Sequence, residues 1–180
     1  MIIITKYKLV TDEKDSSKQR VKSEEKNICP ICLGDILKVI GSRNRNAFDS
    51  KGERQTIVIR RLRCFTCKKI HHELPDILGP YKRYLSKCIE SIIEGQADKI
   101  ACESSTIIRL THWFKGMGIH IKGSLAAIMS RIAVKIEAVN KTALEAIKTY
   151  VGEEIGWLAR AVRIVVNTNN WVHTRLAFMA

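Results

Sequence analysis

The sequence lacks an apolar run long enough to cross a membrane. Charged residues interrupt each apolar stretch well short of the roughly 20 residues that a membrane-spanning helix needs. The apolar run at Met1–Ile4 has no basic residues before it and stops at Thr5, so no secretory signal peptide is expected. We therefore predict a cytoplasmic protein that has no membrane partner.

Motifs of catalysis are also absent from the sequence. It contains no Gly-rich phosphate-binding loop, no nucleophile elbow and no H-E-x-x-H zinc motif. The 18 acidic residues are scattered, whereas a nuclease or transposase core needs several carboxylates grouped around divalent metal ions. Glu153 and Glu154 are more simply explained as a solvated helix face. We predict that the chain is not an enzyme and takes no small-molecule substrate.

Acidic residues are few compared with basic ones. The 180 residues include 31 Lys and Arg against 18 Asp and Glu, which gives a formal net charge of +13 and a pI near 9.7. The chain holds one ordinary domain or two small ones, and in so short a chain this excess predicts a polyanionic partner, usually nucleic acid. The alternative is a basic surface that only keeps the protein in solution.

Four of the six cysteines form two C-x-x-C pairs. Two residues between thiolates let both sulfurs reach one ion, and two such pairs complete a closed tetrahedral site. In a reducing compartment, paired cysteines are metal ligands more often than disulfides. We predict one structural Zn²⁺, bound by Cys29, Cys32, Cys64 and Cys67, with no coordination position left for catalysis. Unmetallated cysteines and a redox pair are the alternatives.

Two histidines and two further cysteines have other interpretations. His71 and His72 follow Cys67 closely and could replace a ligand, but the four cysteines already complete the site, so surface or packing roles are favoured. Cys88 on a helical apolar face and Cys102 in a turn region are expected to be small core side chains.

The residue pattern divides the chain into four regions. Residues 1–27 hold a short strand or ordered arm and then a charged segment without an apolar face, which predicts a solvated linker. Residues 28–80 contain two β-branched runs around a turn at 49–53, so we expect a hairpin that carries the cysteine pairs. A helix-turn-helix is predicted over 81–118, and a helical packing or dimerisation region over 119–180. The predicted fold class is α+β: an N-terminal four-cysteine zinc ribbon on a β-hairpin, followed by an all-α helix-turn-helix and a C-terminal helical region.

The periodicity becomes helical after residue 80. Residues 85–93 place apolar side chains on one face, and Gly95 is positioned to end that helix. A second helix is expected over 104–115, with a serine as its N-cap and two glycines at its end. Two amphipathic stretches follow within 123–166, and a final short helix is expected over 171–178.

Basic residues are concentrated around the predicted hairpin. Ten Lys and Arg against three Asp and Glu lie between residues 28 and 70. Alternation along a strand puts Arg61 and Arg63 on one face, and paired arginines on an exposed face suit phosphate contacts. The predicted nucleic-acid contacts in this region are Arg43, Arg45, Arg60, Arg61, Arg63, Lys68 and Lys69. Solubility is again the alternative.

The helix at 104–115 is the candidate recognition helix, because the N-terminal residues of such a helix reach base edges. Arg109 could pair with guanine, and Thr106 could touch a thymine methyl group or a phosphate. The predicted contacts on this helix are Thr106, Arg109, His112 and Lys115. Trp113 lies on the same outward side but could equally belong to the core. A helical core segment with no DNA role would show the same pattern.

The C-terminal helices have broad apolar faces that include Trp157 and Trp171. Core packing or a homodimer interface explains these faces, and a dimer would match two-fold symmetric DNA sites.

Three segments carry a resemblance to known proteins: ICPICLGDILKVIGSRNR, VIRRLRCFTCKKIHHELPDILGPYKRYLSKCIESII and ESSTIIRLTHWFK. Together they span about residues 27–115. The chain resembles small proteins of uncharacterised function from Gram-positive bacteria, whose transposase-like N-terminal zinc ribbon is followed by a helix-turn-helix. Similar arrangements in several insertion-sequence transposases bind transposon ends. The resemblance implies DNA binding and a link to a mobile element, without a catalytic core.

The leading prediction is therefore a cytoplasmic zinc-ribbon, helix-turn-helix protein that binds double-stranded DNA, as a regulator or DNA-binding subunit of a mobile element. The alternative is a zinc-stabilised protein-interaction module, an adaptor or inhibitor that sets its basic face against an acidic protein. An RNA-binding ribbon is a third possibility.

Overall fold

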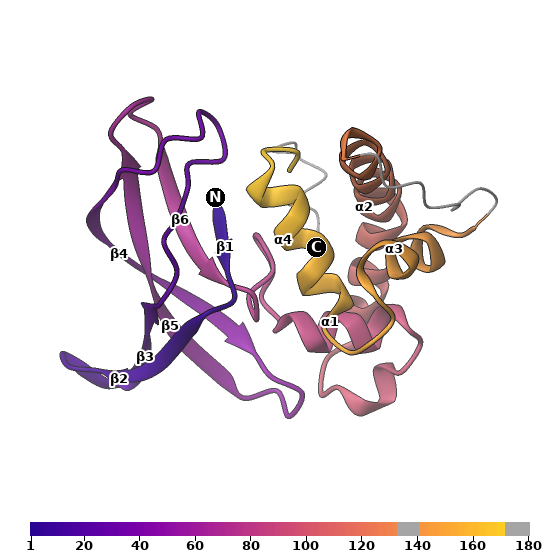
Figure 1. Ribbon diagram of the computed structural model, residues 1–180. Helices are drawn as coiled ribbons and strands as arrows, with labels where there is room; N and C mark the ends of the chain where they lie inside the picture. The colour runs from indigo at the N-terminus through magenta and orange to yellow at the C-terminus, as the bar shows by residue number, and fades with distance from the viewer. Residues whose placement is uncertain (133–140, 172–180) are drawn as a thin grey trace.

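A curled mixed sheet forms the N-terminal part of the computed structural model, which describes residues 1–132 and 141–171 (Figure 1). The strands are β1 (Ile2–Ile4), β2 (Tyr7–Asp12), β3 (Asp15–Ser23), β4 (Leu37–Phe48), β5 (Arg54–Cys64) and β6 (Ile70–Pro75). They follow the order β1-β6-β5-β3-β2, and β4 pairs with β5. The β1–β6 and β3–β5 pairs are parallel, and the others are antiparallel.

Helices form the other part of the molecule. They are α1 (Ser86–Ile93), the short 3₁₀ turn η1 (Ala97–Lys99), α2 (Ser104–Arg131), α3 (Ala143–Val151) and α4 (Trp157–Asn167). Figure 1 shows α4 as the helix beside the sheet, next to β1.

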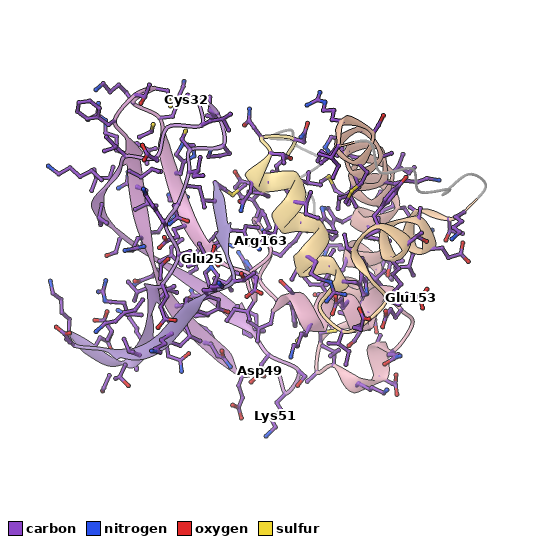
Figure 2. The ribbon with its side chains drawn as sticks, in the orientation of Figure 1. Glu25, Cys32, Asp49, Lys51, Glu153 and Arg163 are labelled. Carbon is purple, nitrogen blue, oxygen red and sulfur yellow. The ribbon has the colours of Figure 1, made fainter. Side chains whose placement is uncertain are left out.

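Polar contacts join α4 to the sheet. The Asn167 side chain exchanges two hydrogen bonds of 2.8 Å with the backbone of Ile3. Arg163 of α4 reaches the Glu25 carboxylate at 3.1 Å, and Figure 2 shows the two residues between the layers. One buried apolar core runs from Ile2 to Trp171 across both parts. No helix in the described parts of the chain is both long and apolar enough to cross a membrane.

The predicted fold, a zinc ribbon followed by a helix-turn-helix, is wrong. The expected hairpin exists as β4–β5, but it belongs to the six-stranded sheet. Ile57 and Ile59 of β5 lie in the same apolar core as the buried side chains of the helices. Ten residues, including η1, separate the end of α1 from the start of α2. A helix-turn-helix needs a turn of about three or four residues. Neither predicted unit therefore stands alone.

The predicted linker is a pair of strands. Residues 11–27 contain the end of β2 and all of β3, and β3 lies between β2 and β5. Most side chains of β2 and β3 are exposed or half-buried, whereas Val21 and Asp12 are buried, Asp12 beside Arg20. Strands with two polar faces show no hydrophobic alternation, so their sequence pattern cannot be told from that of a solvated segment.

The predicted helix at 85–93 is confirmed, whereas the helix predicted over 104–115 is longer than expected. Helix α1 matches 85–93 closely, and Gly95 follows it with φ +80°. Helix α2, however, continues past Gly116 and Gly118 to Arg131. A Cβ atom at Gly118 would lie 3.3 Å from Ala143 and from the Phe114 ring. That glycine therefore allows close packing of α2 on α3 instead of ending the helix.

The predicted C-terminal stretches divide differently from the sequence pattern. The start of the first stretch continues α2, and its end lies in 133–140, outside the described residues. The second stretch breaks into α3 and α4, because Gly152 and Gly156 adopt φ values of +88° and +93°. Of the predicted final helix, only the buried Trp171 is described, and 172–180 lie outside the described residues.

Candidate functional site

The four predicted metal ligands converge. Their sulfur atoms all lie within 4.8 Å of one another, with Cys29 and Cys67 at 3.6 Å and Cys32 and Cys64 at 3.5 Å. All four cysteines are free thiols. A tetrahedral ion with Zn–S bonds of about 2.3 Å would separate its ligands by about 3.8 Å. The cluster could therefore hold one metal ion, as the sequence predicts for these four residues. That they bind an ion, and that the ion is zinc, stay predictions.

The β4–β5 hairpin brings the two cysteine pairs together. Cys29 and Cys32 precede β4, Cys64 ends β5, and the strand register places Leu37 opposite Cys64. Figure 2 shows Cys32 at one end of the sheet and Asp49 and Lys51, in the β4–β5 turn, at the other. The long interval between the two pairs is thus filled by two antiparallel strands.

The two C-x-x-C loops, which we call the knuckles, have matching backbone hydrogen bonds. Leu33 N–H donates to Cys29 O at 2.9 Å, and Lys68 N–H donates to Cys64 O at 3.1 Å. In return, Cys29 N–H donates to Gly34 O at 2.8 Å, and Cys64 N–H donates to Lys69 O at 3.0 Å. Leu33 and Lys68 both have φ +60°, the left-handed conformation that makes this tight turn. The two knuckles thus share one backbone conformation, which directs the two sulfur atoms of each loop in the same way.

Backbone amides and neighbouring thiols set the protonation of the cluster. A hydrogen bond from the backbone of Cys67 lowers the pKa of Cys64 to about 6. The backbone of Lys69 favours the Cys67 thiolate, but burial and the other three cysteines outweigh it and raise the pKa of Cys67 to about 11. Four thiolates cannot gather without a cation, because like charges at this distance repel. A bound metal ion reverses this balance and keeps all four deprotonated.

His71, for which the sequence favours a surface or packing role, is a buried neighbour of the cysteine cluster. It is buried, and its Nε2 lies 3.3 Å from Cys29 Sγ while its Nδ1 lies 3.4 Å from the Met1 amino group. Burial, with a smaller effect of that amino group, lowers the pKa of His71 to about 4. The neutral ring can donate its Nε2–H to the sulfur and orient this ligand. Alternation in β6, which puts His71 on the same face as buried Glu73, is the signal that could have found it.

Arg60, a predicted nucleic-acid contact, is engaged inside the sheet. Its guanidinium forms two hydrogen bonds of 2.6 Å with Glu73, whose side chain is fully buried. Asn27 donates a further hydrogen bond to the same carboxylate. Paired in this way, Arg60 compensates a buried charge, which occupies two of its N–H donors.

Arg43 and Arg45, by contrast, line a hollow of about 490 Å³ between β4 and the loop before α1. We call it the basic groove. Its cationic side chains are those of Arg43, Arg45, Arg54, Lys82 and Arg83. Arg45 donates to Lys82 O at 3.2 Å, and Phe48 N–H donates to Arg83 O at 2.7 Å, which joins the loop to the end of β4. Among the described residues, no carboxylate lines this groove.

The groove carries uncompensated positive charge. Burial and then Arg43 lower the pKa of Arg45, and burial followed by Arg43 and Arg61 lowers the pKa of His72. Arg43, Arg54 and Arg83 form no ion pair within residues 1–132 and 141–171. The cations therefore repel one another without an internal counter-ion. Lys82 and Arg83 were missed in the sequence because they lie far from Arg43 along the chain. Arg54 lies within the basic segment 28–70 but was not singled out as a contact.

A second hollow, of about 750 Å³, adjoins the groove and shares Phe48, Lys82 and Arg83 with it. Its wall includes Thr106 and Arg109 from the first turns of α2. Arg109 donates to Thr106 Oγ1 at 3.1 Å and to Ser105 O at 3.3 Å, and its side chain remains exposed. The structure thus brings predicted contacts from β4 and α2 to one surface.

The other predicted contacts lie elsewhere. His112 and Lys115 are exposed farther along α2, and Arg63, Lys68 and Lys69 are exposed near the knuckles. Arg61 is half-buried and pairs with His72 across β5 and β6. Of the predicted contacts, only Arg43, Arg45, Thr106 and Arg109 therefore line the two adjoining hollows.

Lys82 and Trp113 form a buried pair beneath the two hollows. Lys82 is 3% exposed, and its Nζ lies 4.3 Å from the centre of the Trp113 ring. Burial lowers the pKa of Lys82 to about 8, and Nζ has no hydrogen-bond acceptor among the described residues. Trp113 therefore belongs to the core and not to the outward face of α2. The ammonium adds positive potential below the groove.

Residues 29–110 match a protein family described as a domain of unknown function (DUF6431). The matched segment begins at the first metal ligand and ends at Leu110, so it holds both the cysteine cluster and the basic groove. No curated protein and no solved structure matches the chain. The family match thus covers the candidate site and supplies no activity for it.

Proposed function

We propose that this chain is a zinc-stabilised DNA-binding protein and that its basic groove holds the sugar–phosphate backbone. The observation that carries the proposal is the groove itself. Arg43, Arg45, Arg54 and Arg83 line a single hollow with the buried Lys82 beneath it, and no described carboxylate lines it.

Phosphate is the ligand that this donor set suits. Guanidinium groups offer planar pairs of N–H donors that match phosphate oxygens, and charge-assisted hydrogen bonds are stronger than neutral ones. Because no carboxylate pairs with these cations among the described residues, a bound phosphate would relieve their mutual repulsion as well as add contacts. The unmatched charge is therefore a reason for binding and not only for solubility.

The extent of the basic surface favours a polymer over a single phosphate ion. The second hollow, whose wall also includes Glu103, continues the groove toward Arg109, and Arg61 with His72 continues it along the sheet. Backbone contacts spread over such a surface position a nucleic acid without reading its sequence. This arrangement replaces the predicted recognition helix as the basis for binding.

Zinc is the ion that we propose for the cysteine cluster. Four thiolates in a closed tetrahedral set are typical of structural zinc, which supplies folding energy and no open coordination position. The ion would fix the ends of β5 and β6, and β5 pairs with the strand that carries Arg43 and Arg45.

Salt-dependent binding tests the proposal. Fluorescence anisotropy with a labelled 20-base-pair duplex should show affinity that falls steeply between 50 and 300 mM salt, with a slope of about −0.9 per phosphate contacted. Arg43→Glu and Arg83→Glu should each weaken binding at least tenfold.

Lys14→Glu, in the exposed β2–β3 turn, is the matched control and should have a small effect. Absence of binding to any nucleic acid at 50 mM salt would contradict the proposal. Equal effects of all three variants would show that net charge, and not the groove, is responsible. Tighter binding to RNA would reassign the polymer.

The link to a mobile element, the cytoplasmic location, the homodimer and the absence of catalysis stay predictions from the sequence. The first depends on the resemblance alone.

A further inference from the structure

The end of the sheet that holds the cysteines exposes a cluster of apolar side chains. Of thirteen large apolar residues that are exposed in the described chain, eight lie between residues 28 and 70. Six of them, between 48% and 75% exposed, form what we call the apolar tip: Ile28, Ile31, Leu33, Ile36, Phe65 and Ile70. Single exposed apolar residues are ordinary, but a group in one place marks an interaction surface.

The tip is continuous across both knuckles. Phe65 N–H donates to Ile36 O at 2.9 Å, which places these two residues side by side. Gly34 and Thr66 also adjoin, since a Cβ atom at Gly34 would lie 2.9 Å from Thr66 Oγ1. The four sulfurs, two from each loop, lie within 4.8 Å of one another, so the zinc ion that we propose would join the loops. A metal-fixed platform therefore presents the apolar side chains in a defined arrangement.

Positive charges surround this platform. The nearby cations Lys38, Arg63, Lys68 and Lys69 form no ion pair within the described residues, and Lys68 Nζ lies 4.3 Å from the centre of the Phe65 ring. The one acid of the first knuckle loop, Asp35, pairs with Lys26. An occupant of the tip must therefore offer apolar groups at its centre and negative charge at its edge.

Three of the possible occupants fit poorly. Nucleic acids dock on exposed aromatic rings through base stacking, and five of the six tip side chains are aliphatic. A second copy of the chain would place like-charged rims against each other across a two-fold axis. Peripheral membrane binding is typical of amphipathic helices, and the tip is built from two loops and contains no helix.

We infer that the apolar tip is a docking surface for a second protein, one whose apolar patch is bordered by Asp and Glu. The inference is independent of the proposed DNA binding, because the groove is lined by cations whereas the tip is built from apolar side chains. A protein that binds DNA through its groove and a partner through its tip would bring that partner to DNA.

Site-specific photo-crosslinking tests the inference. The full chain, with Phe65 replaced by p-benzoylphenylalanine, would be expressed in the cells of its source and irradiated. The expected result is an adduct with one protein, absent when the same probe replaces Ile108, an exposed residue of α2. The captured protein would then be purified and its affinity for the unlabelled chain measured by calorimetry.

Leu33→Asn and Ile36→Asn should weaken that affinity at least tenfold, and Ile108→Asn should not. Asparagine tolerates the left-handed conformation of Leu33, so the first variant keeps the knuckle intact, and its zinc content provides the folding check. Lys69→Glu should weaken binding further at low salt.

An adduct with another copy of the chain, with nucleic acid or with lipid would overturn the inference. So would the absence of an adduct, or a captured protein whose affinity the tip variants leave unchanged. DNA binding by the same variants reports separately on the groove.

Discussion

At the scale of single residues, the metal knuckles depend on two strained backbone positions. Leu33 and Lys68 both adopt φ +60°, where a side-chain-bearing residue is disfavoured by about 1–2 kcal/mol. Their N–H groups each donate to the carbonyl of the first cysteine in the pair. The conformation is therefore required by the turn that brings both sulfurs to one point.

Leu33→Gly should raise the free energy of unfolding by about 0.5–1 kcal/mol, because relief of the left-handed conformation exceeds the added entropy of an unfolded glycine. The exposed Leu33 side chain gives up little buried area. Leu33→Val should lower it by about 1 kcal/mol or more, since a β-branched side chain tolerates this region least. Urea unfolding at fixed zinc concentration measures both. A valine variant as stable as the parent would show that the knuckle carries no such strain.

The residues that the sequence identified best are those whose chemistry is local. The two C-x-x-C spacings predict the cluster because each pair folds within one short loop. Arg60 shows where this reasoning ends. Its charge predicts a surface contact, but its partner Glu73 lies thirteen residues away and is brought to it only by the β5–β6 register. Trp113 is similar, since the cation above its ring comes from the loop before α1.

At the scale of elements, α4 begins without a cap of its own. Gly156 at its start has no side chain, and the first N–H groups are satisfied from α1 instead. The buried Glu90 accepts from Gly156 N–H at 2.9 Å and from Leu158 N–H at 2.6 Å. One carboxylate therefore joins α1 to α4 and meets the positive end of the helix dipole.

Glu90→Ala should cost about 1–3 kcal/mol of stability, because two buried donors lose their acceptor. Burial raises the pKa of Glu90 above its ordinary 4.5, although the two N–H groups oppose the shift. A raised pKa means that the protonated form favours folding. This contribution is full below about pH 4.5 and is lost as pH rises through the raised pKa. The free energy of unfolding of the parent protein should therefore exceed that of Glu90→Gln by less at pH 7 than at pH 4.5.

Urea unfolding at the two pH values provides the measurement, and Lys87→Ala, an exposed change on the same helix, is the control. A difference between parent and Glu90→Gln that grows with pH would contradict the assignment.

Helices and strands could be predicted from the sequence where one of their faces is apolar and the other is polar. Helix α1 has that pattern, and its limits were found within a residue. Strands β2 and β3 have two polar faces, so only their pairing with β5 reveals them. The continuation of α2 past Gly116 and Gly118 follows from packing on α3, which sequence periodicity cannot show.

At the scale of the whole molecule, the cysteine cluster and the helices share one structural unit. Strand β5 ends at the ligand Cys64 and contributes Ile57 and Ile59 to the core that includes Trp113 and Trp157. Loss of order at the knuckles therefore releases a strand on which the helical side packs. Metal binding is expected to stabilise the full fold and not only residues 28–70.

After metal removal the protein should therefore still unfold in one transition, at a lower temperature. At a free zinc concentration 100 times the dissociation constant, binding contributes about 2.7 kcal/mol, which for a chain of this size corresponds to a Tm decrease on chelation of roughly 5–10 °C. Tryptophan emission and far-ultraviolet circular dichroism should report the same lowered midpoint, since the three tryptophans lie outside the sheet. Cys64→Ser should show the low Tm without chelator and no further change when chelator is added.

If chelation leaves the tryptophan transition in place while the strand signal is lost, the sheet and helices unfold separately. If Cys64→Ser retains stoichiometric zinc and the parental Tm, Cys64 is not a ligand.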